Sequence, residues 1–151
     1  MDKSERVIDL KREEGFIEEY VSLRNLNSEL LTTQLVNVAE TKDWLKDNQI
    51  EVRGLVKDDI FLGAVVLYLN RDGEIALFVR NRHQGIGTKL LKIVEQVAEE
   101  KKLGSVWAWV LLDNQKAQRA FRKNGYTMEG QSSRFYEGKN KPGIIFRKQL
   151  P

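Results

Sequence analysis

The stretch EIALFVRNRHQGIGTKLLKIVEQVAEEKK, which runs from Glu74 to Lys102, decides the fold. After its leading glutamate, the segment 74–79 is apolar at every position, which predicts a central strand buried on both sides. The segment 80–87 is a basic turn with two glycines. The segment 88–102 then carries apolar residues at helical spacing, with a single stripe that faces the core. Together they predict a strand, a turn and a long helix.

Gly85 and Gly87 lie where this helix is expected to begin. A helix start presents unpaired backbone N–H groups and roughly half a positive charge. Residues without a Cβ atom let a phosphate group come close to those donors. The turn is therefore predicted to bind an anion.

The other segments complete an α/β pattern. Further strands are predicted at 7–10, 50–57, 60–69, 105–113, 126–136 and 144–150, and further helices at 13–31, 39–46 and 114–124. Thr41 is the expected cap of the second helix, and Glu137–Gly143 is read as a loop. Strands that flank a crossover helix are parallel neighbours. We expect one α/β domain with a mixed sheet over residues 1–151.

Composition excludes several kinds of chemistry. The 151 residues can bury a core without a metal or disulfide, and the chain has no cysteine and only one histidine, His83. Thiolate and histidine-rich metal sites are thereby excluded, and we expect no metal. The net charge of +3 is dispersed, which argues against a nucleic-acid partner. No signal peptide or membrane-length apolar run is present, which favours a cytoplasmic protein without a membrane partner.

Three interpretations of the glycine turn compete. A dinucleotide fingerprint, GxGxxG, is not met because position 90 is leucine. The nucleoside-triphosphate loop GxxxxGK[ST] is absent. The third interpretation is an ordinary glycine-containing turn that leads into a helix.

A second pattern favours a functional role for the turn. The motif N-x-x-A-x-x-x-F-x-x-x-G-Y runs from Asn114 to Tyr126, and the first motif reads R-x-x-G-x-G from Arg82 to Gly87. The pair resembles the GNAT superfamily of acyl-CoA-dependent N-acyltransferases. The resemblance implies a single-domain fold whose mixed sheet of six to seven strands is splayed at the middle and flanked by about four helices. It also implies an enzyme with acetyl-CoA as cosubstrate.

The resemblance further implies which residues bind the cosubstrate. Backbone amides of the turn would hold the pyrophosphate, while the central strand and the second motif would hold the pantetheine arm. The implied residues are Phe78, Val79, Arg82, Gln84, Gly85, Ile86, Gly87, Thr88, Asn114, Ala117 and Phe121. The cations Arg80, Arg119, Arg122 and Lys123 are candidate contacts for the adenosine phosphates.

Two residues are candidates for proton transfer. Glu74 opens the central strand at a position where some members of this family carry the general base, and its alternative is an ordinary charged residue after a turn. Phe121 stands where many members carry a tyrosine that protonates the leaving thiolate, and phenylalanine has no such proton. Water or Tyr136 would then substitute, unless Tyr136 is only a strand aromatic.

The family builds its acceptor site from the N-terminal helices, which makes Arg24 and Trp44 candidate acceptor contacts. We expect a small-molecule amine as acceptor, such as an amino sugar. The alternatives are a protein N-terminus or lysine, and a non-catalytic sensor that binds acyl-CoA. An acidic acceptor pocket would suit a polyamine, and a basic one a nucleotide-linked sugar. A homodimer that pairs through the last strand is a further expectation.

Overall fold

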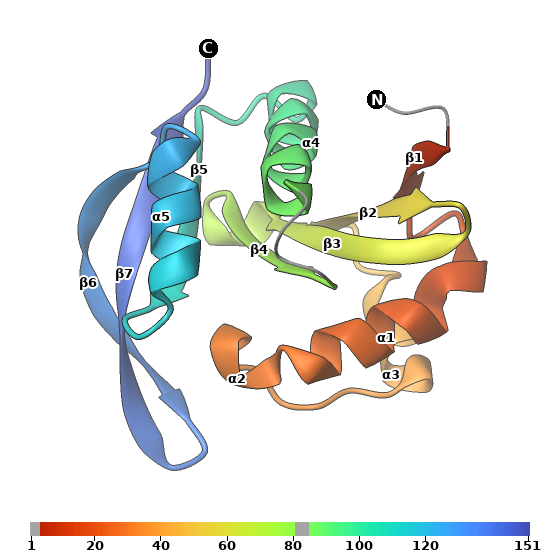
Figure 1. Cartoon of the computed structure of the whole chain (residues 1–151), viewed down its shortest axis with the longest axis horizontal. Coiled ribbons are helices and arrows are strands. Elements are labelled where there is room, and N and C mark those ends of the chain that lie inside the picture. Colours follow the sequence, from red (N-terminus) through yellow and green to blue (C-terminus); the bar gives the residue numbers. More distant parts are fainter. Residues whose placement is uncertain (1–3, 81–84) are drawn as a thin grey trace.

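Residues 4–80 and 85–151 are described by a computed structural model, and they form a seven-stranded sheet with the order β1-β2-β3-β4-β5-β7-β6 (Figure 1). The strands are β1 (Glu5–Asp9), β2 (Ile50–Lys57), β3 (Ile60–Tyr68), β4 (Glu74–Val79), β5 (Ser105–Leu111), β6 (Thr127–Tyr136) and β7 (Lys139–Gln149). The helices are α1 (Ile17–Leu26), α2 (Ser28–Leu31), α3 (Val38–Trp44), α4 (Ile86–Glu100) and α5 (Gln115–Lys123), with short 3-10 turns at Glu14–Phe16 and Leu69–Arg71. The predicted α/β class is confirmed.

The strands β4 and β5 are parallel neighbours, as the crossover predicted. Within the described residues they pair at one position only, where Glu74 aligns with Trp107. Beyond that point β4 stays paired with β3, and β5 stays paired with β7 along its whole length. The sheet therefore opens between β4 and β5, and the expectation of a mixed sheet splayed at its middle is confirmed.

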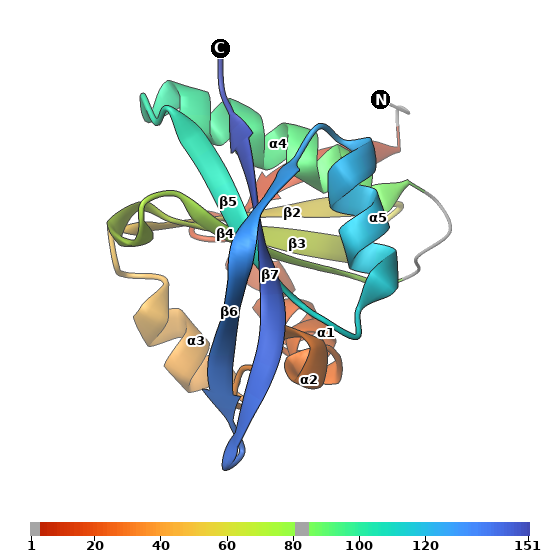
Figure 2. The ribbon, with the colours of Figure 1, turned by 90° about the vertical axis from the view of Figure 1, so that its left-hand side faces the viewer.

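Helices cover both faces of the sheet (Figure 1). The helices α4 and α5 pack on one face, in a core that includes Ile75 of β4 and Phe121 of α5. The helices α1 and α3 lie on the other face, in a core that includes Phe78 of β4. Figure 2 shows β6 and β7 as a long twisted ribbon between α5 and α3. Odd-numbered and even-numbered apolar residues of β4 thus pack into two different cores, one on each face of the sheet.

The prediction that β4 is buried on both sides was only partly right. Ile75 and Phe78 are buried, whereas Ala76, Leu77 and Val79 are half-buried. These three positions line the opening beside β5, because the neighbouring strand has already diverged there. Their partial exposure is the first sign of a site.

Two predicted helix features were wrong. The single helix expected at 13–31 is broken at Asn27, whose side-chain amide donates to the Leu23 carbonyl at 2.8 Å and competes with the helical backbone. The cap of α3 is Asn37, which forms a reciprocal capping box with Glu40. Thr41 lies inside that helix and donates to the Asn37 carbonyl at 2.8 Å.

The final hairpin also differs from its prediction. Strand β7 begins at Lys139, so the predicted loop at 137–143 shrinks to a tight turn at Glu137 and Gly138, both with positive φ. Strand β7 also lies between β5 and β6 rather than at an edge. Residues 143–147 of β7 have strand neighbours on both sides, so this stretch offers no open edge to a second copy. That the protein forms a homodimer remains a prediction.

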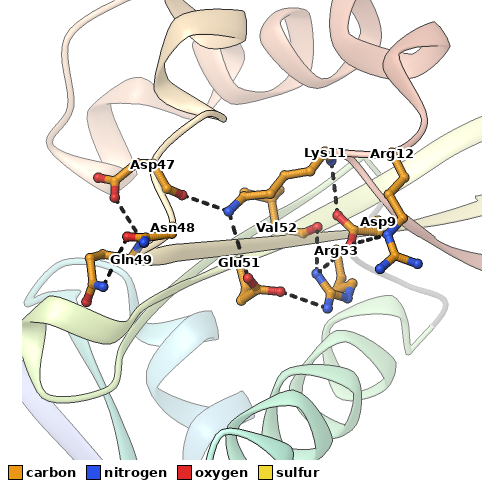
Figure 3. A network of polar contacts seen from close by, with 9 residues as sticks. All are labelled: Asp9, Lys11, Arg12, Asp47, Asn48, Gln49, Glu51, Val52 and Arg53. Atoms are coloured by element: carbon orange, nitrogen blue, oxygen red, sulfur yellow. Dashed lines mark hydrogen bonds and ion pairs between the residues drawn. The ribbon is translucent and has the colours of Figure 1, made fainter.

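A polar network fastens the N-terminal segment to the sheet (Figure 3). The Lys11 ammonium donates to the Asp47 carbonyl at 2.7 Å and lies 3.8 Å from the Glu51 carboxylate. Arg53 pairs with Glu51 at 2.9 Å and with Asp9 at 3.6 Å. These contacts join the segment after β1 to strand β2 and to the loop before β2. They hold in place the chain segment that leads into α1. None of the helices in the described part of the chain is long and apolar enough to cross a membrane.

Candidate functional site

A cavity of about 560 Å³ occupies the opening between β4 and β5. This volume is within the usual range for small-molecule sites, about 300 to 1,000 Å³. The cavity follows β4 over its six residues, a length of roughly 17 Å at the usual strand rise. The start of α4, one face of α5 and the short helix α2 close its sides. The site is thus long and narrow, and both walls have backbone groups that lack a strand partner.

The start of α4 forms one end of the cavity. Gly85 is the N-cap residue and has a left-handed backbone, with φ +68°, which glycine adopts without strain. A Cβ atom at Gly85 or Gly87 would meet no other atom within 4 Å. Gly85, Gly87 and Thr88 line the cavity, whereas Ile86 does not, and its side chain is buried in the core. An anion can therefore approach the first amides of the helix.

Arg82 and Gln84 lie outside the described residues, as does His83. Their predicted contacts with the phosphates remain predictions. Phe78 and Val79 line the cavity at the end of β4, beside the helix start. Their backbone is free of β5 at this point, since the two strands pair only at Glu74.

The second motif lies on the opposite wall. Asn114 caps α5, and its Oδ1 accepts the amide N–H of Ala117 at 3.2 Å. Its side-chain amino group remains to serve a ligand, because the cap uses only the oxygen. Ala117 and Phe121 also line the cavity, and the Phe121 ring stacks on Phe146 with centroids 5.9 Å apart. The structure thus brings the two sequence motifs to opposite walls of one cavity.

One face of α5 is basic. Lys116, Arg119 and Lys123 line the cavity at the i, i+3 and i+7 spacing of a single helix face. Arg122 instead lies over the Phe146 ring, and the Arg80 guanidinium donates to the Phe61 carbonyl at 2.8 Å. Sequence reasoning missed Lys116, although the helical spacing from Arg119 and Lys123 could have found it.

Glu74 lies at the other end of β4, at the apex of the opening. Its side chain is buried, it lines the cavity, and it forms an ion pair with Arg71 at 3.3 Å. Its second oxygen accepts from Arg134, which comes from β6 and also lines the cavity. Sequence reasoning found Glu74 but missed both arginines, since Arg134 is distant in sequence and follows no local pattern.

Tyr68 lies directly opposite Glu74 in the pairing of β3 with β4. Burial raises the pKa of the Tyr68 phenol, and the charge of Arg71 opposes that rise. Glu74 adds to the rise, while Arg24 and Arg134 oppose it. The phenol therefore stays protonated at neutral pH, next to a charged cluster.

The structure does not bring the remaining candidates into the cavity. Among the described lining residues, Tyr136, Arg24 and Trp44 are all missing. Tyr136 ends β6 and aligns with Lys139 at the tip of the hairpin. Arg24 donates to the Gln34 carbonyl at 2.9 Å, and Trp44 stacks on Tyr20 with ring centroids 6.3 Å apart. Their predicted roles are not supported by direct contact with the cavity.

Comparison with protein families adds an independent observation. Residues 20–126 match the model of the acetyltransferase (GNAT) family, which is more than half of the chain. The chain belongs to the GNAT acetyltransferase family. It is accordingly an acyltransferase, and the match spans both motifs and every cavity-lining residue except Arg134. A comparison with curated protein sequences found no match.

Solved GNAT structures share the fold at low identity. yncA from Salmonella typhimurium, solved with its cofactor acetyl-CoA, has a TM-score of 0.81 and 17% identity, over 99% of this chain and 95% of that one. The ribosomal-protein-alanine N-acetyltransferase of Brucella melitensis gives 0.81 and 18%, over 97% and 99%. The spermidine N-acetyltransferase SpeG of Vibrio cholerae, an N152L mutant, gives 0.78 and 17%, over 98% and 95%. The TM-scores establish a common fold, and the acceptors named for the last two proteins differ.

The residues of this GNAT acetyltransferase fit acetyl-CoA. The cavity offers an accessible helix start for phosphate oxygens, and a wall of three cations on α5. The backbone of β4 beside β5 is free to pair with the amide groups of a pantetheine arm. Backbone donors for an anion, cationic side chains and an unpaired strand edge thus lie along one cavity.

Replacement of Asn114 tests the wall opposite β4 in this GNAT cavity. Asn114→Ala removes the cap of α5 and the side-chain donors, so it should lower the free energy of unfolding by about 1 kcal/mol. It should also weaken CoA binding about 3- to 10-fold, the value of one hydrogen bond. Chemical denaturation and calorimetric titration with CoA measure the two effects.

Asn114→Asp is the matched control, because aspartate caps as well as asparagine but lacks the amino group. It should retain the stability and still lose CoA affinity. Equal CoA affinity in the wild type and both variants would remove Asn114 from the cofactor site.

Proposed function

We propose that this protein transfers an acetyl group from acetyl-CoA to the primary amine of a small molecule, such as an amino sugar. The observation that carries the proposal is the position of Glu74: a buried carboxylate lies at one end of β4, and the accessible start of α4 lies beyond the other end. A cavity that joins an anion-binding end to a buried carboxylate can hold an acyl-CoA and meet an amine.

Each residue in the cofactor half of the site has a proposed role. The backbone amides at Gly85 and Gly87 bind the pyrophosphate. Arg82 and Gln84, which belong to the same turn, make further contacts with the phosphates. The backbone of Phe78 and Val79 pairs with the pantetheine arm, and Asn114 donates to it. Acetyl-CoA supplies an acetyl group activated as a thioester.

The chemistry then requires two protons to leave the acceptor ammonium, one before the nitrogen attacks and one after the new bond has formed. An alkyl amine has a pKa of about 10, so it is protonated at neutral pH and its nitrogen cannot attack. Glu74 takes the first proton, directly or through a water molecule. The nitrogen forms a bond to the acetyl carbon, the carbon–sulfur bond breaks, and the sulfur leaves with the bonding electrons. The nitrogen then gives its second proton to water, which leaves a neutral amide.

Phe121 offers no proton to the leaving sulfur. The conjugate thiol has a pKa of about 8.5, so a thiolate is a tolerable leaving group and can take its proton from water. A general acid contributes typically about 10²- to 10⁴-fold, so its loss slows the reaction without preventing it. The ring instead packs against Phe146 and Tyr126 and shapes the cavity wall.

A small acceptor is favoured by the wall that α2 provides. Asn27, Leu30 and Leu31 line the cavity, and Leu30 also lies beside Asn114 and Lys116 at the start of α5. They narrow the cavity, which suits a small molecule better than a folded protein surface. A protein acceptor, as named for the Brucella melitensis relative, is the main alternative.

The direct test is to incubate the protein with acetyl-CoA and a panel of amines, and to follow the release of free thiol. We expect stabilisation by CoA in a thermal melt, together with turnover of at least one small amine. Stabilisation without turnover across small amines, peptides and lysine substrates would support a sensor. Neither stabilisation nor turnover would contradict the proposed function.

A further inference from the structure

The acceptor end of the cavity holds more positive than negative charge. Glu74 is bound by two guanidinium groups, those of Arg71 and Arg134. Arg24 also acts on this region, because its charge lowers the pKa of Tyr68 against the dominant effect of burial. The charged groups that act on Tyr68 are therefore three arginines and one glutamate. One carboxylate does not neutralise the cluster.

Two of the arginines are held rigidly by aromatic rings. The Arg134 guanidinium lies over the Trp109 ring at 4.8 Å, and that of Arg71 lies over the Tyr68 ring at 4.2 Å. The Trp109 ring is itself fixed, because its indole N–H donates to the Ser132 carbonyl at 3.1 Å. Stacked guanidinium groups lose little freedom when they bind a planar or tetrahedral oxyanion. The guanidinium groups of Arg71 and Arg134 are therefore pre-organised to bind an oxyanion.

Arg134 has donors left for such a ligand. A guanidinium has five N–H donors, and the contact with Glu74 uses one nitrogen of Arg134. The Arg134 side chain is 33% exposed and lines the cavity, so its other donors can be reached from within the cavity. Glu74 beside it is only 6% exposed. An acceptor that enters the cavity therefore meets a cation next to the carboxylate.

We propose that the acceptor is an amine that also carries an oxyanion, a carboxylate or a phosphate, and that Arg134 binds this oxyanion. The inference rests on the proposed function, because it assigns the acceptor of the same site. Glu74 then faces the ammonium end of the acceptor while Arg134 faces its anionic end. The two side chains are already in contact, so an acceptor whose amine and oxyanion are close together fits both at once.

The same charges disfavour a polyamine. A spermidine-like acceptor would bring several positive charges next to Arg134, and the one carboxylate there is already paired with Arg71 and Arg134. An unmodified amino sugar would leave the Arg134 donors without a partner. The cluster thus narrows the proposed small amine to an anionic one.

Matched acceptor pairs test this assignment. Each pair differs only by the anionic group: an α-amino acid and its decarboxylated amine, and glucosamine 6-phosphate and glucosamine, with spermidine as the cationic reference. We expect at least one anionic member to give a kcat/KM about 10- to 100-fold above its partner, the usual value of a charge-assisted hydrogen bond. The pair that responds shows whether the oxyanion is a carboxylate or a phosphate.

Arg134→Gln should raise the KM of the anionic acceptor about 10- to 100-fold and leave the KM of acetyl-CoA unchanged. Arg134→Lys should recover part of that loss, because it keeps the charge without the planar fork. Lys139→Gln removes a positive charge from the same hairpin, outside the cavity lining, and should change neither constant. A purely structural role for Arg134 would move both KM values or only the stability.

Calorimetric binding of each acceptor to the CoA-loaded protein gives a readout that does not need turnover. If no amine is turned over but the anionic members bind more tightly than their partners, the proposed reaction fails and the inference on the acceptor stands. Equal or better binding and turnover of spermidine or of the members that lack the oxyanion would overturn the inference, while the proposed reaction stands.

Discussion

Glu74→Gln is expected to lower kcat by about 10²- to 10⁴-fold, the usual contribution of a general base. Glutamine has nearly the same shape and can still accept from Arg71 or Arg134, but its amide cannot take a proton from the amine. The KM of acetyl-CoA should remain unchanged, because the cofactor residues lie along β4 and α5 beyond Glu74. Release of free thiol, followed from pH 6 to 9, measures the effect.

The matched control for this variant is Glu29→Gln, which removes an exposed carboxylate from α2 outside the cavity lining. It should retain the wild-type rate. CoA binding by the Glu74 variant shows that the fold is intact. If Glu74→Gln kept the wild-type rate over the whole pH range, Glu74 would not be the base.

Gly143→Ala is expected to destabilise the protein by about 3 kcal/mol, the upper part of the usual range for overpacking. Gly143 in β7 lies against Trp109 of β5, and a Cβ atom there would be 2.2 Å from the indole Cε2. The ring has little room to move, since it is fixed by Ser132 and covered by Arg134. At about 2–4 °C per kcal/mol for a chain of this size, the melting temperature should fall by about 6–12 °C.

Gly130→Ala is the control, because a Cβ atom at Gly130 meets no other atom within 4 Å and the position lies in the neighbouring strand β6. Its effect on the melting temperature should be small. The Gly143 variant should also lose acceptor affinity, because displacement of Trp109 moves the stacked Arg134. An unchanged melting temperature for Gly143→Ala would show that Trp109 does not have the fixed position described above.

Local patterns were enough to predict the central part of the fold. The strand at 74–79, the glycine turn and the amphipathic helix after it are each encoded within a few residues, by side-chain alternation, by Gly85 and Gly87, and by helical spacing. The parallel arrangement of β4 and β5 followed from the handedness of crossover connections. The two motifs then indicated which walls of the cavity bind the cofactor.

Contacts between distant segments could not be predicted in this way. Arg134 meets Glu74 across sixty positions of sequence, and no periodicity in β6 marks the one arginine that turns inward. The place of β7 between β5 and β6 is a pairing between distant segments that no local pattern encodes. The break at Asn27 arises from a side-chain hydrogen bond that competes with the helix, and the apolar spacing on both sides of it is unchanged.

The single paired position between β4 and β5 affects the stability of the protein. Two half-sheets meet at Glu74 and Trp107, and each presents an inward strand edge, the kind of edge that other extended chains can join. A ligand that fills this opening adds its own binding free energy to that of folding, about 2.7 kcal/mol at a hundred times its Kd. We therefore expect the folded protein to be more stable when acyl-CoA is present than when it is absent.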